Sequence, residues 1–390
     1  MSFKITKLNK AFDWESCRDR IGEFEKECEP NPWASWFNLN LIFKKHFPGS
    51  TFWLAEIFSD QNGKLIAAGI WRETISKRKC LKLKVLRTVD VVAMRLPPFL
   101  MRKNYEEEAC KMMAEALPEI ARETGAHLMS LYQQYGMPME RWCNELTRRK
   151  VLFSKKILTY NPQIISPCNI DELITSRAKS RIRKIEISVR KLIKDKGDEP
   201  VYQHFTGSFN SQPELKEMWI DFQNIWHNSW QWNYLKEQDE KVFTATKEQL
   251  EETIDYLSRM GWLDISLLKI NDIGIVGYIC AVIDDRVWMV FSSYRKDYKK
   301  YAPGVNLFRK LQKDFQQQKK KVIDFGGEAL DWKRKWANFE EPLLNIEYPI
   351  GGLQGKLWAF YQRFFGKKEV RIKKLHEIQS LNDYEQSKKS

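Results

Sequence analysis

Hydrophobic positions between residues 263 and 294 form three runs that are separated by very short polar turns. The runs read LDISLLKI, GIVGYICAVI and RVWMVFSSY, and the turns are Asn271-Asp272 and Asp284-Asp285. Apolar, β-branched and aromatic runs joined by two-residue polar turns are typical of β-hairpins. The pattern therefore predicts three consecutive antiparallel strands.

A helical period follows these runs. Apolar residues recur three or four positions apart, and Pro303-Gly304 stands where the helix would begin. The short apolar run VIDFGG then predicts a strand, the segment around DWKRKWANF a second helix, and LLNIEYPI a last strand. The predicted order in this part of the chain is three strands, helix, strand, helix, strand.

A similar order of elements occurs earlier in the chain. The runs FWLAEIF, LIAAGIW and LKLKVLRTVDVV predict strands, YEEEACKMMAEALPEIARE a helix, and AHLMSLYQ another strand. The two parts share little sequence, so the repeat is one of architecture and not of chemistry. We predict an α/β (α+β) fold of two similar domains, each a mixed, mostly antiparallel sheet flanked by helices. The expected division is 1–165, a basic linking helix at 166–200, 201–352, and a basic aromatic tail at 353–390.

The linking segment and the tail each allow two interpretations. In TSRAKSRIRKIEISVRKLIKDKGDEP the apolar residues share one helical face and the basic residues lie largely on the others. This helix could bind phosphate groups or simply be solvated between domains. The tail mixes aromatic and basic residues, so it could lie on an anionic membrane surface or pack back on its domain.

Composition narrows the class of protein. The chain has 390 residues, 43% of them hydrophobic and 13% aromatic, which excludes a disordered protein and fits two domains. No charge-free stretch is long enough to span a membrane and no secretory signal is recognisable, so we expect a cytoplasmic protein. Seven scattered cysteines without a CxxC pair favour neither a disulfide framework nor a zinc site, and we expect no metal.

The formal net charge of +14 attracts anions to the surface. The partner could be a nucleotide cofactor, tRNA, an acidic substrate or an anionic membrane. The excess of positive charge could equally be a solubilising surface.

Several short patterns occur in a characteristic order. They are Asn31-Pro32-Trp33-Ala34-Ser35-Trp36, the Arg-rich helix Ser176 to Leu192, Ser229-Trp230-Gln231, Ser293-Tyr294 with Tyr298, Ala302-Pro303-Gly304, Asp324-Phe325-Gly326-Gly327 and Asp331-Trp332-Lys333 with Trp336. In this order and spacing the chain resembles the GNAT acyltransferase superfamily, in particular the cellulose-biosynthesis-type acetyltransferases, which are related to Fem-type peptidyltransferases. Gln231 stands where that branch usually has lysine, and the Q/R-x-x-G-x-G/A loop of typical GNAT enzymes is missing. These departures concern the donor more than the fold.

The resemblance implies that acyl-CoA, with acetyl-CoA as the first candidate, binds at the start of the helix after the third strand. There the residues would be Pro303, Gly304, Val305 and Asn306. The first turn of a helix has unpaired N–H groups and a positive dipole end, and both favour a pyrophosphate. Lys299 and Lys300 could add charge or be solvated. The alternative is an ordinary helix start without a ligand.

Direct acyl transfer requires a base for the acceptor's proton and donors for the oxyanion. Our candidates are Asp324, Tyr294 and, third, Glu328. Asp324 could instead be a structural carboxylate that binds a loop or pairs with Lys333. Cys280, on an apolar strand, is expected to be a core residue and not a nucleophile.

The resemblance places acceptor binding at Ser229, Trp230, Gln231, Trp332 and Lys333. Aromatic rings offer flat surfaces to sugars or apolar chains, and a lysine can hold a carboxylate or phosphate. Two neighbouring residues have simpler interpretations: we expect Trp226 to pack in the core and His227 to be exposed.

The leading hypothesis is an N- or O-acyltransferase that moves an acyl group from acyl-CoA to an amine or hydroxyl of a small metabolite or envelope-sugar precursor. The first alternative is a Fem-type transferase that takes an aminoacyl group from charged tRNA. The second is a non-catalytic binding protein of this fold in a polysaccharide or membrane complex. Peripheral contact with an anionic inner membrane fits any of the three.

Overall fold

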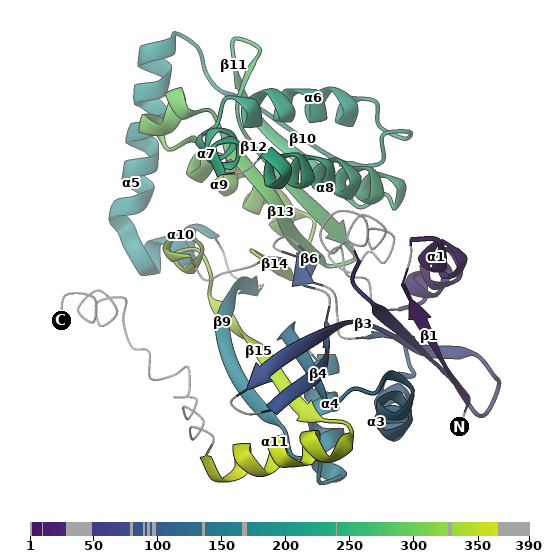
Figure 1. Ribbon diagram of the computed structural model, residues 1–390. Helices are drawn as coiled ribbons and strands as arrows, with labels where there is room; N and C mark the ends of the chain where they lie inside the picture. Colours follow the sequence, from purple (N-terminus) through teal and green to yellow (C-terminus); the bar gives the residue numbers. More distant parts are fainter. Residues whose placement is uncertain are drawn as a thin grey trace.

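The computed structural model describes residues 2–9, 11–28, 49–78, 81–88, 90–91, 94–95, 99–134, 137–165, 170–238, 240–326 and 330–365. One large twisted sheet runs through the molecule, with helices on both of its faces (Figure 1). The N-terminal half of the sheet uses strands β1 (Ser2–Leu8), β2 (Phe52–Phe58), β3 (Leu65–Arg78), β4 (Leu81–Thr88), β7 (Leu100–Met101) and β8 (Leu128–Gln134), and β5 (Asp90–Val91) pairs separately with β6 (Met94–Arg95). The remaining strands are β9 (Ser154–Ile165), β10 (Val201–Gly207), β11 (Leu263–Ile270), β12 (Ile273–Ile283), β13 (Arg286–Tyr294), β14 (Val322–Asp324) and β15 (Phe339–Pro349).

Helices connect these strands in the predicted order. Those of the first part of the chain are α1 (Ala11–Lys26), α3 (Glu106–Thr124), α4 (Met137–Arg148) and the long α5 (Ile170–Lys196). Those of the second part are α6 (Glu214–His227), α7 (Trp230–Gln238), α8 (Glu240–Arg259), the 3-10 helix η3 (Lys296–Tyr301), α9 (Pro303–Gln317), α10 (Asp331–Arg334) and α11 (Gly352–Phe365). The predicted three-strand meander at 263–294 and the helix after it are confirmed, as is the earlier strand-helix series.

The order of strands is nearly symmetric about the centre of the sheet. It reads β1-β2-β3-β4-β8-β15-β9-β14-β13-β12-β11-β10. On each side an antiparallel meander ends in one parallel pair, β4 with β8 and β13 with β14. The helix between the paired strands, α3 on one side and α9 on the other, supplies the crossover that a parallel pair requires. The predicted fold class of tandem, mostly antiparallel α/β units is confirmed.

The two halves exchange their central strands. β9 comes early in the chain but pairs with β14, whereas β15 comes late and pairs with β8. The two exchanged strands also pair with each other over nearly their whole length. The sheet therefore runs across the domain limits expected at residues 165 and 201, and those limits stay a prediction about the chain.

Alternate residues of the C-terminal strands face two different helical layers. Leu263, Ile265 and Leu267 of β11 join the core beneath α6 and α8, whereas Leu268 and Ile270 join the core beneath α9. Such alternation follows from the two-residue period of a strand. It identifies the face of the sheet to which each site residue belongs.

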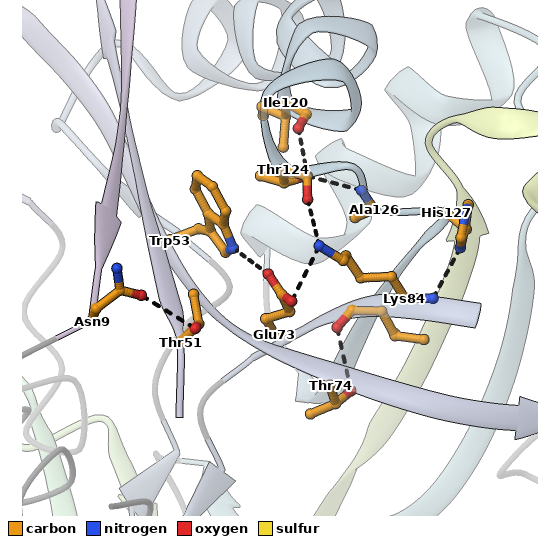
Figure 2. A network of polar contacts seen from close by, with 11 residues as sticks. Asn9, Thr51, Trp53, Glu73, Thr74, Lys84, Ile120, Thr124, Ala126 and His127 are labelled. Carbon is orange, nitrogen blue, oxygen red and sulfur yellow. Dashed lines mark hydrogen bonds and ion pairs between the residues drawn. The ribbon is translucent and has the colours of Figure 1, made fainter. Parts of the chain in front are cut away.

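A polar network fixes the N-terminal half (Figure 2). Glu73 of β3 accepts a hydrogen bond from Trp53 Nε1 at 2.9 Å and pairs with Lys84 Nζ of β4 at 3.2 Å. Lys84 Nζ also donates to the Thr124 carbonyl at the end of α3, and its backbone N–H donates to His127 Nδ1 at 2.9 Å. The polar atoms of the network thus fasten α3 to the middle strands.

α11 packs back on the molecule, as one interpretation of the tail expects. Trp358 and Ala359 are buried against Leu83, Val85 and Leu128 of the sheet. Residues 366–390 of the tail lie outside the described residues. Among the helices that the structure describes, none is long and apolar enough to cross a membrane.

Candidate functional site

β13 and β14 separate after a short contact. They pair only at Arg286–Trp288 and Val322–Asp324, and β14 ends there while β13 continues to Tyr294. The ladder between β12 and β13 jumps near this point, so that Val290 is an extra residue in β13. A bulge of this kind bends the strand and interrupts its pairing. The result is a V-shaped opening whose closed end lies at Trp288 and Asp324. No local pattern of residues predicts the bulge.

α9 begins beyond the open end of this V. Ala302 adopts a left-handed φ of 47°, Pro303 is the first helical residue, and the first turn contains no acidic residue. A Cβ on Gly304 would meet only the Tyr278 hydroxyl oxygen, at 3.6 Å, so packing does not require glycine there. Tyr278 Oη donates to the Gly304 carbonyl at 3.2 Å. The structure thus offers an uncharged helix start with space in front of Gly304, in which the Val305 N–H donates to the Ala302 carbonyl at 3.2 Å.

Lysines surround this helix start. Lys296 and Lys299 of η3 are exposed, whereas Lys300 pairs with Asp195 of α5 at 3.3 Å. Asp195 also accepts a hydrogen bond from Tyr301 Oη at 2.8 Å, and these contacts lower the pKa of its carboxyl group. Of the two lysines considered from the sequence, Lys299 remains exposed beside α9, and Lys300 helps to attach α5.

Asp324 lies at the closed end of the V and is fully buried. Asn161 Nδ2 donates to both of its oxygens at 2.9 Å, Gln163 Nε2 donates to Oδ2 at 3.0 Å, and the Gly326 N–H donates to Oδ1 at 2.8 Å. These contacts match the structural carboxylate that the sequence left as an alternative. A catalytic role for Asp324 stays a prediction.

Glu341 of β15 joins the same network and was missed from the sequence. Its Oε2 accepts a hydrogen bond from Gln163 Nε2 at 3.0 Å, so one amide bridges the carboxylates of Asp324 and Glu341. Glu341 is only half-buried. Only the pairing of β9 with both β14 and β15 brings these side chains together, and no local sequence pattern announces it.

The structure does not bring Asp324 and Tyr294 together. Tyr294 lies six residues beyond Trp288 along β13, roughly 20 Å at the rise of a strand. Tyr294 and Ile323 both pack on the α9 side of the sheet. Asp324 is the next residue of the strand after Ile323, so it faces the other side. Asp324 marks the closed end of the V and Tyr294 its open end. Glu328 lies outside the described residues.

Gln231, in the first turn of α7, contacts the end of β13. Its Nε2 donates to the Ser292 carbonyl at 2.9 Å, and its Oε1 accepts from Ser293 Oγ at 2.8 Å. Ser229 is fully buried, and its Oγ accepts a hydrogen bond from the Trp232 N–H at 3.2 Å. Both side chains are therefore engaged within the protein. Trp230, by contrast, is 51% exposed.

The α10 residues of the expected acceptor site lie behind the closed end of the V. Trp332 packs edge-on against Phe325 and is 39% exposed. Lys333 Nζ donates to the Gly326 carbonyl and lies over the Trp332 ring. Lys333 thus attaches α10 to the segment that follows β14, and its role in acceptor binding stays a prediction.

Three expectations about neighbouring residues are confirmed. Trp226 is buried against Phe291 and Trp232, His227 is exposed, and Cys280 is a fully buried core residue. Burial raises the pKa of the Cys280 thiol, which disfavours the nucleophilic thiolate. Within the described ranges no three His, Cys, Asp or Glu side chains form a group that could hold a metal ion.

A basic surface extends from the start of α9 along α5. The side chains described on α5 bury Ile185 and Leu192, and the exposed side carries mostly positive charge. The exposed basic residues are Arg183, Lys184, Arg190, Lys191, Lys194 and Lys196 of α5 with Lys296, Lys299 and Lys300 of η3. We call these residues the α5 basic surface.

Residues 183–334 match the family model of the acetyltransferase (GNAT) domain. The chain carries a GNAT domain. This domain includes the V between β13 and β14, the start of α9 and the contact of Gln231 with β13. The resemblance to the GNAT superfamily seen in the sequence is thereby confirmed, although the matched segment is less than half of the chain. No curated protein matches the chain.

Several solved structures align with most of the chain. A conserved protein of unknown function from Bacteroides thetaiotaomicron has a TM-score of 0.51 at 10% identity over 89% of this chain and 100% of that one. L-PGS from Bacillus licheniformis has a TM-score of 0.46 at 12% identity over 90% and 97%. FemX has a TM-score of 0.42 at 12% identity over 92% and 99%. At such low identity the first of these shows a shared fold and nothing about substrate.

Proposed function

We propose that the protein is an acyltransferase that takes an acyl group, with acetyl as the first candidate, from acyl-CoA. Its acceptor would be an amine or hydroxyl of a small metabolite or envelope-sugar precursor. The observation that carries the proposal is the uncharged start of α9 at the open end of the V within a GNAT domain. The N–H groups of Gly304 and Asn306 would bind the pyrophosphate, with Lys296 and Lys299 adding positive charge.

In this proposal the reacting carbonyl lies toward the closed end of the V. The acceptor's nucleophile attacks that carbonyl, its proton passes to a carboxylate, and the thiolate of CoA leaves. The half-buried Glu341 is the better placed base, because Asp324 is fully buried and its oxygens already accept four hydrogen bonds. Asp324 would then position Glu341 through Gln163. Tyr294, near the open end, would contact the donor, and Glu328 remains a sequence-based candidate.

Exposed aromatic rings support an acceptor with a flat or apolar part. Trp230 of α7 and Trp332 of α10 both present much of their surface to solvent. Large amphipathic rings of this kind pack well against sugars. We propose Trp332 and Lys333 as the first contacts for the acceptor, because they lie nearer the closed end of the V, whereas Trp230 and Ser229 lie near its open end and would contact only a distant part of an extended acceptor.

Calorimetry with acetyl-CoA and longer acyl-CoAs tests this function directly. We expect binding, and we expect 3′,5′-ADP alone to bind because it carries the phosphates. Mass spectrometry of natively purified protein should reveal a bound thioester. If no acyl-CoA and no 3′,5′-ADP bind even at low ionic strength, the proposed function is wrong.

The α5 basic surface supports aminoacyl transfer from charged tRNA as a second candidate function. It carries nine exposed basic residues on α5 and on η3, which directly precedes α9. Lysines and arginines on one face favour a polyphosphate backbone, and such binding weakens steeply with salt. Filter binding of tRNA should show this salt dependence and should weaken in Lys191→Glu/Lys194→Glu. Absence of binding at low ionic strength would exclude this candidate.

The outer side of α11 supports peripheral contact with an anionic membrane. Leu353 is 73% exposed, Leu357 and Phe360 are also exposed, and Lys356 lies between them. Apolar side chains beside basic ones are typical of helices that lie on a membrane surface. A cytoplasmic protein with such a contact should co-sediment with anionic vesicles, and Leu353→Ser/Leu357→Ser should abolish co-sedimentation. Vesicle binding without any donor binding would favour the non-catalytic alternative.

A further inference from the structure

In the proposed function the donor reaches from the start of α9 toward the closed end of the V, so its arm would pass along one edge of β13. The Arg295 N–H donates to the Ile275 carbonyl of the β12 side at 2.9 Å. Because backbone groups of successive residues in an antiparallel pair point alternately to the two sides, those of Ser292 and Lys296 point away from β12. They point to the outer edge, which β14 leaves open beyond Trp288.

The turn between α6 and α7 closes this edge. The Lys296 N–H donates to the Asn228 carbonyl at 3.1 Å, and Gln231 Nε2 donates to the Ser292 carbonyl at 2.9 Å. Ser293 Oγ, which is almost completely buried, donates to Gln231 Oε1 at 2.8 Å. Two of the backbone groups that face this edge, the Ser292 carbonyl and the Lys296 N–H, are thus already bonded within the protein.

A glutamine closes the edge more completely than a lysine would. An amide side chain both donates and accepts, so Gln231 uses its Nε2 for Ser292 and its Oε1 for Ser293. A lysine could donate to Ser292 but could not accept from Ser293. The pantetheine arm of CoA contains two amides, which seek the same kind of backbone partner that Gln231 has taken.

We propose that Gln231 acts as a latch on the outer edge of β13. Its side chain occupies the Ser292 carbonyl until the pantetheine arm of the donor displaces it. This proposal rests on the proposed function and assigns Gln231 to the donor and not to the acceptor. The free energy needed to break the two hydrogen bonds of Gln231 lowers the affinity for any donor that lies along β13. The latch therefore selects donors whose own amides replace the lost bonds. The 3′,5′-ADP part of the donor binds at α9 and does not compete with Gln231.

The test is calorimetry with desulfo-CoA and with 3′,5′-ADP on the full-length protein. Gln231→Met keeps the length of the side chain and removes both hydrogen bonds, so desulfo-CoA should bind about tenfold more tightly. Gln231→Lys should give an intermediate affinity, and 3′,5′-ADP should bind all three proteins equally. Asn233→Ala, an exposed position on the same helix, should change neither affinity. Thermal unfolding establishes that each variant is folded.

The outcomes separate the latch from the function on which it rests. Equal or weaker binding of desulfo-CoA to Gln231→Met would overturn the latch while leaving the acyl-CoA proposal intact. Binding of desulfo-CoA only after the substitution would support the latch. If neither probe binds the wild type or any variant, both the latch and the acyl-CoA donor are wrong.

Discussion

The starts of α3 and α9 occupy corresponding places in the two halves of the sheet but have opposite electrostatic character. Each helix connects two parallel neighbours, β4 to β8 and β13 to β14. α3 opens with Glu106, Glu107 and Glu108, whereas the first turn of α9 has no acidic residue. Glutamates complement the positive end of a helix, and they repel an anion that approaches it.

The glutamates of α3 also have partners within the protein. Glu106 pairs with Arg141 of α4 at 3.4 Å, and Glu108 Oε1 accepts a hydrogen bond from Ser59 Oγ at 3.0 Å. In the N-terminal half the helix start is thus used to hold the fold together. In the C-terminal half the corresponding position has no acidic residue, which agrees with the ligand site proposed there.

Placing a glutamate at the start of α9 should have the largest effect on binding. Gly304→Glu gives α9 the charge found on α3 and fits the backbone, because a Cβ at residue 304 meets only the Tyr278 hydroxyl. We expect the affinity for 3′,5′-ADP to fall more than about a hundredfold through repulsion between charges a few ångströms apart. Calorimetry measures the change. Gly304→Gln, with the same length and no charge, should retain much more of the affinity than Gly304→Glu does.

Asp324→Asn should have the next largest effect, on stability. The substitution replaces an oxygen acceptor by an NH₂ group among side chains that already donate, so buried polar groups lose their partners. The free energy of unfolding should fall by about 2–3 kcal/mol in urea denaturation. Unchanged stability would mean that the network around Asp324 can reorganise, and a pure catalytic role would then regain support.

The two halves should also respond in opposite ways to pH. Burial by itself lowers the pKa of His204, but hydrogen bonds and charge from Asp264 and Asp314 overcome it and raise the pKa to about 9. For His127, burial and the neighbouring Lys84 lower the pKa. His204 therefore adds stability that is complete below its ordinary value of 6.5 and is lost as pH rises to about 9. His127 adds stability above 6.5 that is lost as pH falls below that value.

Urea unfolding of the wild type, His204→Gln and His127→Gln between pH 5 and 9.5 measures this difference. The destabilisation caused by His204→Gln should shrink by about 2 kcal/mol as pH rises from 6.5 to 9, after allowance for partial solvent screening. The destabilisation caused by His127→Gln should shrink as pH falls below 6.5. If the free energy of unfolding changes with pH in the same way in all three proteins, the raised pKa of His204 and the lowered pKa of His127 are wrong.

Gly304→Ala should have the smallest effect. A methyl group fits at residue 304, and alanine favours a helix, so stability should stay the same or rise by up to about 1 kcal/mol. The methyl group would stand among the N–H groups proposed to bind phosphate. The affinity for 3′,5′-ADP should therefore fall about fivefold, because the methyl group displaces the ligand. Unchanged affinity would place the phosphates elsewhere.

Local patterns in the sequence determined most elements of the fold. The polar two-residue turns predicted the meander of β11, β12 and β13, and the apolar period after Pro303 predicted α9. These features depend on neighbours within a few residues, for which spacing and turn chemistry suffice. The burial of Trp226 and Cys280 and the exposure of His227 followed from the same reasoning.

Only the tertiary structure decided how the site is assembled. Gln163 of β9 lies next to Asp324 and Glu341 because the two halves exchange their central strands, and these pairings join residues far apart in the chain. Likewise, the contact of Gln231 with Ser292 depends on where α7 packs and on the place where β14 ends. The sequence alone determined which residues form strands and helices, because that depends on local spacing. Which strands lie side by side, and which polar groups are then satisfied, depends on the free energy of the whole packed sheet.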